Sequence, residues 1–494
     1  MTHPRRSSKP VPFSTQLGRV LIIAAALVAF KSGAQDLPAS AQKALRAAGV
    51  PRSSVAAWVQ EVGAARPIVA LRADTAMNPA SVMKLVTTYA GLELLGPAYR
   101  WKTEVYLDGE NLVLRGTGDP KLNYESFWML LRNLRGRGLR DLRGDLVLDR
   151  SYFAPAPYSP FDSDTYRPYN VTPDALLINF KSLRFTFVPE GEKGVRVFAE
   201  PGLPGMEIVN SLKLGGGNCP DGTRAFREAV QASFQSQPPR ATFAGTYPLA
   251  CGERELNVAL HDPADYLAGL VRQLWAEMGG TWSGTVREGS ASPTARLIYT
   301  HDSEPLAEIV RDINKFSNNV MARQLFLTLG AERGAPPARS EEAARVVRDW
   351  VAAKKIRAPE LVLENGSGLS RVERISAEHL GALLQAAWRS PVMPEFVSSM
   401  PIVAADGTMK KRLNGGRVAG NAHIKTGLLA DARAIAGYVL DRNNRRYVVV
   451  MIINHPKAHE AEPAVDALLE WVYDSATNRA PAITNRPVAS PSRP

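Results

Sequence analysis

The chain has 494 residues, of which 45% are hydrophobic and 22% are charged, and its formal net charge is +12. It contains no block of Lys and Arg interleaved with aromatic residues, which argues against a nucleic-acid partner. The positive charge allows an anionic partner, either a polymer or a membrane surface with which the protein associates weakly. An ordinary solvated surface explains the charge equally well.

The N-terminus predicts a secretory signal. Basic residues from Arg5 to Arg19 precede an apolar run at 20–30, which ends in Ser32-Gly33-Ala34. The run is shorter than the roughly 20 residues that cross a bilayer, and no Cys follows it to carry a lipid anchor. We expect general secretion, cleavage after Ala34 and a periplasmic mature protein; an uncleaved signal would leave the protein tethered.

The mature chain is long enough for several domains. Residues 1–34 contain five basic and no acidic residues, so their removal leaves 460 residues with a net charge of +7. At about 150 residues per domain, this length predicts around three domains. The two cysteines, Cys219 and Cys251, can pair in an oxidising compartment, and the alternative is two buried free thiols.

Two strands and a helix are predicted first along the chain. Residues 55–62 and 68–72 are rich in β-branched side chains and flank a turn, which predicts a hairpin. After Ser81, apolar residues recur at helical spacing until Gly96-Pro97 ends the helix. From 101 to about 288, short alternating segments broken by Gly, Pro and Asn predict a β-rich insertion.

Helical spacing then returns, and a second hairpin follows. The segments 432–440 and 446–453 flank a turn, so we place both hairpins in one antiparallel sheet covered by helices, an α+β fold with an insertion. Helices are predicted at 306–314, 318–329, 341–353 and 463–473, and the tail from 476, rich in Pro, Ser and Asn, is expected to be disordered.

Three short motifs carry the predicted chemistry: Ser81-Val82-Met83-Lys84, Ser317-Asn318-Asn319 and Lys425-Thr426-Gly427. Each of them is weak evidence alone. Their order, their predicted structural settings and the exported compartment make the combination much stronger, because it matches the motifs of serine enzymes that form an acyl-enzyme.

The first motif fits an activated serine. A helix that starts at Ser81 places Lys84 one turn later on the same face, where its amine reaches the hydroxyl. Lysine accepts a proton only when its pKa is lowered by burial or by a nearby positive charge, which Lys425 would supply. The helix start also directs a backbone N–H at the oxyanion. The alternative is that Ser81 only caps the helix.

The other two motifs would complete the cleft. We expect Ser317, at the start of the next helix, to pass the proton to the leaving amine, and Asn319 to hold the substrate backbone. Lys425 and Thr426 would bind a free carboxylate at a strand edge, where Gly427 leaves room for the substrate. The alternatives are a capping serine with loop asparagines, and an exposed strand end.

Other chemistries find little support. His455 and His459 are four residues apart but lack the adjacent Glu of a zinc peptidase. The stretch Gly366-Ser367-Gly368 has no spacer residues between Ser and Gly, so it is not a nucleophile elbow. We expect neither a metal nor a cofactor.

With these motifs the chain resembles the class C low-molecular-mass penicillin-binding proteins, the DacB-like D-alanyl-D-alanine carboxypeptidase/endopeptidase family. The long gap from Ser81 to Ser317 is the most specific feature, and matches at 78–80, 94–97, 281–285 and 365–371 extend it over nearly all of the mature chain. The resemblance implies a penicillin-recognising serine transpeptidase-like catalytic domain with two inserted β-rich domains. The catalytic domain would comprise 35–100 and 292–475, inserted domain II 101–170 and 246–291, and inserted domain III 171–245. The signal peptide at 1–34 would precede them, and the disordered tail at 476–494 would follow.

The resemblance also implies roles for the site residues. Ser81 is the nucleophile, Lys84 the base, Ser317 and Asn319 form the second element, and Lys425 with Thr426 forms the carboxylate pocket. It further implies peptidoglycan stem peptides as substrates, covalent inhibition by β-lactams, and a bridge between Cys219 and Cys251. Three further substrate contacts, two of them weaker matches, are Arg371, Asp164 and Tyr169.

The chain departs from the family pattern at Asn318 and Asn365, where Asp is common, and at Leu428, where Thr or Ser is usual. Because Leu428 keeps its backbone N–H but lacks a hydroxyl for the substrate carboxylate, we predict retained acylation with a tilt toward endopeptidase action. The alternatives are a feebly active cell-wall-binding scaffold and a serine β-lactamase, for which no deacylating carboxylate is recognisable.

Overall fold

The computed structural model describes residues 36–474 except 157–159, 192–193 and 261. The expected signal peptide and C-terminal tail lie outside the described residues. The helices are α1 Ala39–Ala47, α2 Lys84–Leu95, α3 Tyr124–Gly136, α4 Gly222–Ala229, α5 Pro263–Glu277, α6 Leu306–Phe316, α7 Asn319–Arg333, α8 Ser340–Ala353, α9 Ala377–Trp388, α10 Met393–Ser398 and α11 Glu462–Asp474.

One five-stranded antiparallel sheet unites the two ends of the chain. Its strand order is β18-β19-β20-β1-β2, with β1 Val55–Glu61, β2 Val69–Leu71, β18 Ala422–Leu429, β19 Ala432–Leu440 and β20 Arg446–Asn454. Both predicted hairpins are therefore confirmed, and they pair with each other because β1 lies beside β20. The β18 end of the sheet carries the Lys-Thr-Gly motif.

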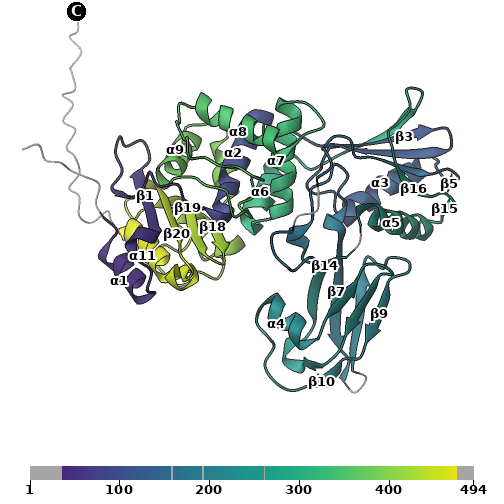
Figure 1. Ribbon diagram of the computed structural model, residues 1–494, viewed down its shortest axis with the longest axis horizontal. Coiled ribbons are helices and arrows are strands. Elements are labelled where there is room, and N and C mark those ends of the chain that lie inside the picture. Colours follow the sequence, from purple (N-terminus) through teal and green to yellow (C-terminus); the bar gives the residue numbers. More distant parts are fainter. Residues whose placement is uncertain (1–35, 157–159, 192–193, 261, 475–494) are drawn as a thin grey trace, which may run out of the picture.

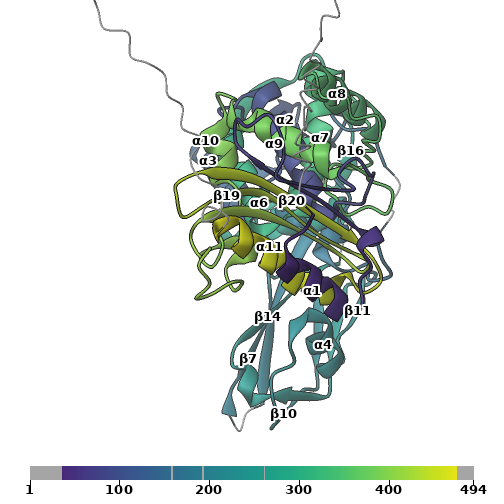
Figure 2. The ribbon, with the colours of Figure 1, turned by 90° about the vertical axis from the view of Figure 1, so that its left-hand side faces the viewer.

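Side chains along these strands alternate between two hydrophobic cores, as the pleat of a strand requires. Val449 and Met451 pack with α1 and α11, whereas Val448 and Val450 pack with the helices on the opposite face. Figure 2 shows α1 and α11 on one side of β19 and β20, with α9 and α2 on the other. The catalytic motifs lie between the sheet and the second group of helices.

Most helices of this domain were predicted within a few residues, but α1, α9 and α10 were not. Helix α9 is buried along much of its surface, at Leu380, Leu383, Leu384 and Ala387 among others. A helix covered on several sides has no clear polar face, so its apolar residues do not stand out at helical spacing.

The segment between α2 and α6 forms the insertion, which extends away from the catalytic sheet (Figure 1). One sheet has the order β16-β6-β4-β3-β17, and two three-stranded sheets have the orders β14-β7-β8 and β11-β12-β9. Smaller pairs join β10 to β13 and β15 to β5. The strands are β3 Lys102–Asp108, β4 Asn111–Gly116, β5 Asp141–Leu142, β6 Leu146–Asp149, β7 Ser182–Pro189, β8 Val195–Glu200, β9 Glu207–Asn210, β10 Lys213–Gly215, β11 Ser233–Gln235, β12 Arg240–Phe243, β13 Thr246–Pro248, β14 Arg254–Ala259, β15 Thr281–Trp282, β16 Val286–Glu288 and β17 Arg296–Asp302.

The strand pairing differs from the domain boundaries that we expected. Strand β14 pairs with β7, so it belongs with the 171–245 unit although it lies beyond residue 245. Strand β17 pairs with β3, so it belongs with the insertion although it lies beyond residue 292. The insertion also contains α3, α4 and α5, which the β-rich pattern did not predict.

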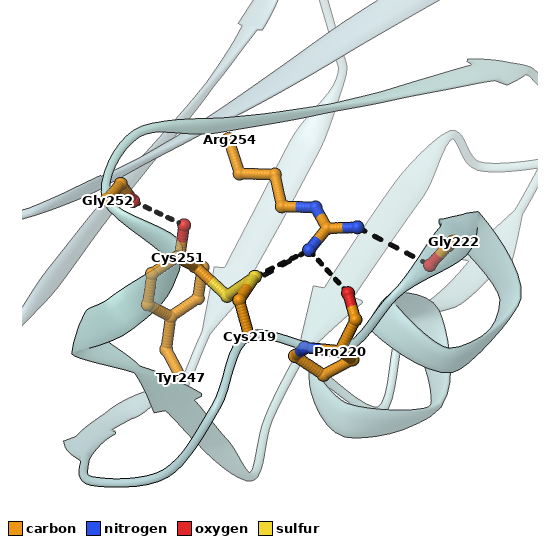
Figure 3. The surroundings of a disulfide bond; sticks show 7 residues. All are labelled: Cys219, Pro220, Gly222, Tyr247, Cys251, Gly252 and Arg254. Atoms are coloured by element: carbon orange, nitrogen blue, oxygen red, sulfur yellow. Dashed lines mark hydrogen bonds between the residues drawn. A yellow bond between two sulfur atoms is a disulfide. The ribbon is translucent and has the colours of Figure 1, made fainter. Parts of the chain in front are cut away.

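A disulfide bond joins Cys219 and Cys251 within the insertion, with an S–S distance of 2.07 Å. Figure 3 shows the guanidinium of Arg254 against this bond. It donates to the carbonyl oxygen of Pro220 at 2.7 Å and stacks 4.3 Å from the centre of the Phe226 ring. The bridge therefore lies in a packed environment at the start of α4.

Within the described ranges, none of the helices combines the length and the apolar character needed to cross a bilayer.

Candidate active site

Ser81 lies in a single 3-10 turn, Ala80–Met83, that leads directly into α2. Lys84 is the first residue of α2, and its Nζ lies 3.0 Å from Oγ of Ser81. The side chain of Ser81 is partly exposed and that of Lys84 is fully buried. The hydroxyl is thus accessible from outside, while the amine approaches it from the protein interior.

Lys84 has two other partners in addition to Ser81. Its Nζ donates to Oδ1 of Asn319 and to the carbonyl oxygen of Ser367, both at 2.5 Å. A neutral amine has two N–H groups and one lone pair. If the two N–H groups bind Asn319 and Ser367, the lone pair is left facing the hydroxyl of Ser81, which is the arrangement that a general base needs.

The environment of Lys84 favours the neutral amine. Burial holds its pKa well below the usual value, and the positive charge of Lys425 lowers it further. The negative charge of Glu373 raises the pKa, and the more weakly felt charge of Arg323 lowers it. The net direction is downward, so Lys84 can accept a proton from Ser81.

Ser317 joins the cluster from the junction of α6 and α7. Its Oγ accepts a hydrogen bond from Nζ of Lys425 at 2.8 Å. We expected Ser317 at the start of the next helix, but it ends α6 with a left-handed φ of 57°, and Asn318 caps α7 by accepting from the N–H of Met321. A strained residue of this kind is typical of functional sites.

Lys425 is also fully buried, and burial lowers its pKa to about 7. Its Nζ donates to the carbonyl oxygen of Thr426 at 2.8 Å in addition to Ser317. The three motifs therefore meet in one cluster, with Ser81 and Lys84 from the start of α2, Ser317 and Asn319 from the α6–α7 junction, and Lys425 from the sheet.

Gly427 packs against the turn that carries Ser81. A Cβ atom at this position would lie 2.5 Å from the carbonyl oxygen of Pro79 and 3.2 Å from the backbone N of Ser81. The missing side chain therefore makes room for the turn that carries Ser81. This contact brings β18 and the backbone N–H of Ser81 together.

The edge of β18 is open beside the cluster. The N–H of Ile424 donates to the carbonyl oxygen of Pro401 at 2.8 Å, and within the described residues the strand-like segment 401–403 covers the edge only up to this point. N–H groups alternate in direction along a strand, so those of Thr426 and Leu428 point to the same edge as that of Ile424. The side chain of Leu428 is 57% exposed.

The loop at 364–373, which contains the family match at 365–371, supports Lys84 and Ser81 from the other side, and its residue Glu373 was not predicted. Glu373 is fully buried, and its carboxylate accepts four backbone N–H bonds of 2.8–3.1 Å from Glu364, Asn365, Gly366 and Gly368. Burial raises the pKa of Glu373 even though these bonds oppose the shift. The loop thus held presents the Ser367 carbonyl to Lys84.

Asn78 ties this loop to the turn of Ser81. Its Nδ2 donates to the carbonyl oxygen of Ser370 at 2.9 Å, while its Oδ1 accepts from the N–H of Ala80, also at 2.9 Å. Asn78 is part of the family match at 78–80. Its signal in the sequence is its position three residues before Ser81, which does not by itself reveal either bond.

Asp164 and Tyr169 lie in a different network from the cluster. Asp164 accepts from Arg167 at 2.6 Å and from Arg227 of α4. Partial burial raises the pKa of Asp164, but the bonds from the two arginines lower it overall. Tyr169 donates to Asp162 at 2.6 Å. These bonds connect the two residues to the insertion, and no described contact joins them to Ser81.

Arg371 connects this segment to the catalytic domain. Its guanidinium stacks on Phe161, 4.8 Å from the ring centre. A cavity of about 750 Å³ opens between the two parts, lined among others by Phe161, Arg323 and Arg371 but not by Ser81. Within the described ranges, no group of three or more His, Cys, Asp or Glu side chains could hold a metal ion.

Comparisons with known proteins agree with this geometry. Residues 31–473 match the model of the D-Ala-D-Ala carboxypeptidase 3 (S13) family. The chain is 27% identical over 428 residues to a D-alanyl-D-alanine carboxypeptidase of Actinomadura sp., covering 82% of this chain and 78% of the relative. It is 23% identical over 403 residues to the D-alanyl-D-alanine carboxypeptidase DacB of Haemophilus influenzae, covering 77% and 81% respectively.

The fold is similar to a solved structure as well. The crystal structure of penicillin-binding protein 4 (dacB) from Haemophilus influenzae superposes with a TM-score of 0.72 at 20% identity, covering 88% of this chain and 99% of that one. The penicillin-recognising serine hydrolase fold predicted from the motifs is thereby confirmed. Because the family model spans nearly all of the described residues, the chain belongs to the D-Ala-D-Ala carboxypeptidase 3 (S13) family.

Proposed function

We propose that this serine hydrolase cleaves D-alanyl-D-alanine-type bonds in peptidoglycan stem peptides and cross-links through an acyl-enzyme at Ser81. The observation that carries the proposal is the 3.0 Å contact between Nζ of Lys84 and Oγ of Ser81, inside a cluster completed by Ser317, Asn319 and Lys425. The family supports the reaction class, since its relatives are named as D-alanyl-D-alanine carboxypeptidases.

Acylation follows from the partners of each group. Lys84 takes the proton from Oγ of Ser81 while the oxygen attacks the carbonyl carbon between the two D-alanines. The N–H groups of Ser81 and Leu428 stabilise the oxyanion at the edge of β18. When the intermediate collapses, the C–N bond breaks and the leaving amine receives the proton held by Lys84, passed through the hydroxyl of Ser317, which Lys425 orients. Lys84 is then neutral again.

Deacylation uses the same base. Lys84 removes a proton from a water molecule that attacks the ester at Ser81, and the ester bond breaks with return of a proton to Oγ. Asn319 holds Lys84 and the substrate backbone during both steps. Lys425 and Thr426 bind the free carboxylate of a terminal D-alanine by charge-assisted hydrogen bonds.

Leu428 tilts this activity toward endopeptidase action. A cross-link differs from a chain end because its leaving group belongs to a second peptide, so fewer contacts to a terminal carboxylate weaken only the carboxypeptidase reaction. If Leu428→Thr raises carboxypeptidase turnover little, this part of the proposal is wrong. Asp164, Tyr169 and Arg371 remain predicted contacts for the diamino acid of the substrate.

The family supports the partners, and the N-terminal sequence supports the location. A relative of this fold has been solved as penicillin-binding protein 4 complexed with a β-lactam, which supports covalent inhibition of this chain by β-lactams. The signal-like N-terminus supports export to the periplasm, where peptidoglycan is accessible.

Labelling with a fluorescent penicillin tests the proposal. We expect wild-type protein to be labelled, Ser81→Ala to lose the label, and the control Ser398→Ala, on the exposed surface of α10, to keep it. Purified wild type should also release D-alanine or split cross-linked muropeptides, resolved by mass. Absence of both label and products in folded wild-type protein would instead support a cell-wall-binding scaffold.

A further inference from the structure

A hydroxyl outside the three motifs lies beside the Lys-Thr-Gly strand. Oγ1 of Thr408, in the 3-10 turn Gly407–Met409, lies 2.9 Å from Oγ1 of Thr426. The side chain of Thr408 is exposed and that of Thr426 is half-buried. The two hydroxyls therefore form a pair that is accessible from the open edge of β18.

The turn that carries Thr408 is firmly attached next to Ser317. Oδ2 of Asp406 accepts from Nζ of Lys315 at 2.6 Å, and Oδ1 accepts from the N–H of Ile402 at 2.7 Å. Lys315 is only 6% exposed and lies two residues before Ser317. An ion pair with one buried partner fixes the position of the turn relative to the catalytic cluster.

Gly407 and Met409 fix the turn on either side of Thr408. Gly407 has a φ of +54°, and a Cβ atom there would lie 2.6 Å from the carbonyl oxygen of Lys315. The turn can therefore approach the end of α6 this closely only with glycine. Met409 is fully buried. The hydroxyl of Thr408 is thus held in place by its neighbours, although its own side chain is exposed.

The position of this hydroxyl matters because Leu428 has none. Residues two apart on a strand share a face, so the side chains of Thr426 and Leu428 lie on the same side of β18. Thr426 is left as the only hydroxyl of the strand on that face next to the cluster. A second hydroxyl donor for a carboxylate must therefore come from another segment, and Thr408 lies within hydrogen-bond distance of Thr426.

We propose that Thr408 is a substrate-binding residue that, together with Thr426, donates a hydrogen bond to the free carboxylate of the terminal D-alanine. The proposal rests on the proposed function and adds a residue to it. Without substrate, one hydroxyl of the pair donates to the other. With a carboxylate bound, both hydroxyls rotate and each donates to an anionic oxygen, a stronger type of bond. No covalent bond forms or breaks, and no proton is transferred.

Thr408→Val tests the proposal because it removes the hydroxyl and keeps the shape. The kcat/KM for a peptide ending in D-Ala-D-Ala should fall about tenfold or more, mainly through KM, as for the loss of a hydrogen bond to a charged group. The same peptide with a C-terminal amide should be hydrolysed at an unchanged rate. Thr408→Ser should restore most of the preference for the free acid.

Matched controls separate this effect from a structural one. Thr246→Val makes the same change at an exposed residue of the insertion, in β13, and should not alter hydrolysis of either substrate. Leu428→Thr in the Thr408→Val background should recover part of the lost preference. An equal loss for acid and amide, or no loss for either, would overturn the assignment of Thr408.

A second comparison tests Thr408 even if the proposed function is wrong. If wild-type protein hydrolyses neither peptide, acylation at Ser81 by benzylpenicillin and by its methyl ester replaces the comparison, since only the former has a free carboxylate. We then expect Thr408→Val to slow acylation by the free acid and not by the ester. If Thr408→Val slows acylation by the two compounds by the same factor, Thr408 does not bind the free carboxylate.

Discussion

Gly368 packs directly against the carbonyl of Ala80, the residue that precedes Ser81. A Cβ atom on Gly368 would lie 1.9 Å from Ala80 O and 2.7 Å from the backbone N of Ser81. Gly427 approaches the same turn from the sheet. The turn that carries Ser81 is therefore clamped between two glycines from segments far apart in the chain.

Gly368→Ala should displace this turn. The position also has a φ of +77°, so alanine adds backbone strain to the clash. Because a displacement of about 1 Å near the chemistry lowers rates by about 100-fold, we expect acylation by penicillin to slow by at least about this factor. Stopped-flow measurement of acylation, with thermal unfolding to confirm folding, checks the result.

Gly63→Ala is the control for Gly368→Ala. Gly63 has a similar φ of +82°, but nothing lies within 4 Å of the place where its Cβ would be. It should therefore lower the free energy of unfolding by about 1 kcal/mol and leave acylation unchanged. If both variants are acylated at the wild-type rate, Gly368 does not position the nucleophile.

The charges around Lys84 predict how the pH dependence of acylation changes. The acylation rate rises with pH as Lys84 loses its proton. The acidic limb of the pH–rate profile therefore follows the pKa of Lys84. Lys425→Gln removes a positive charge that lowers this pKa, and the limb should move to higher pH. Glu373→Gln removes a negative charge that raises it, and the limb should move to lower pH.

Arg323→Gln makes the series quantitative. Its charge also lowers the pKa of Lys84 but has the smallest effect of the three, so the limb should shift in the same direction as for Lys425→Gln and by less. Lys213→Gln, on an exposed strand of the insertion, is the control without a shift. A shift to lower pH in Lys425→Gln would contradict Lys84 as the base. A penicillin ester as the acylating agent avoids the loss of carboxylate binding in that variant.

The sequence predicted local elements much better than their long-range partners. Both hairpins and the helix after Ser81 follow from patterns within about 20 residues, and the structure contains them. The pairing of β14 with β7 joins segments about 70 residues apart, and alternation in a strand does not specify its partner. The strand pairing within the insertion could therefore not be predicted from the local patterns.

The same limit applies to the site. The three motifs identified the groups that meet at Ser81, because each motif has its own local setting. Glu373 and Thr408 belong to no such motif. The importance of Glu373 depends on four N–H groups that the loop presents to it, and that of Thr408 on an ion pair between Asp406 and Lys315. These relationships exist only in the folded chain.

The disulfide bond should stabilise the insertion and not the catalytic cluster. Cys251 packs against the hydrophobic core of the insertion, whereas Lys84 lies at the start of α2, whose side chains belong to another core. A bridge that closes a loop of 32 residues contributes about 3–4 kcal/mol in the chain-entropy model. Replacing both cysteines by serine should lower the melting temperature of the insertion and leave the acylation rate unchanged.

Reductant supplies the control for the double Cys→Ser variant. Wild-type protein should show the same loss of stability when reduced, and the variant should show no further loss. Equal melting curves for oxidised wild type and variant would mean that the bridge does not contribute to stability.

Substitution of Asp164 tests which of two roles this residue has. Its contacts indicate that it holds the insertion together, whereas the family match predicts that it binds the substrate. Asp164 neutralises both Arg167 and Arg227, and each of these side chains is at most 28% exposed. Asp164→Asn leaves two guanidinium groups with a weaker acceptor. Because removing an acceptor from charged donors costs about 1–3 kcal/mol, we expect lower thermal stability and similar losses of activity, if any, on all substrates.

A substrate contact would give another pattern, in which stability is retained and the rise in KM is confined to peptides with a free amino end on the diamino acid. Tyr169→Phe perturbs the same network from its other end, because its hydroxyl donates to Asp162 and accepts from Arg167, the partner of Asp164. A stable Asp164→Asn protein with that selective defect would show that Asp164 exchanges an arginine for the substrate.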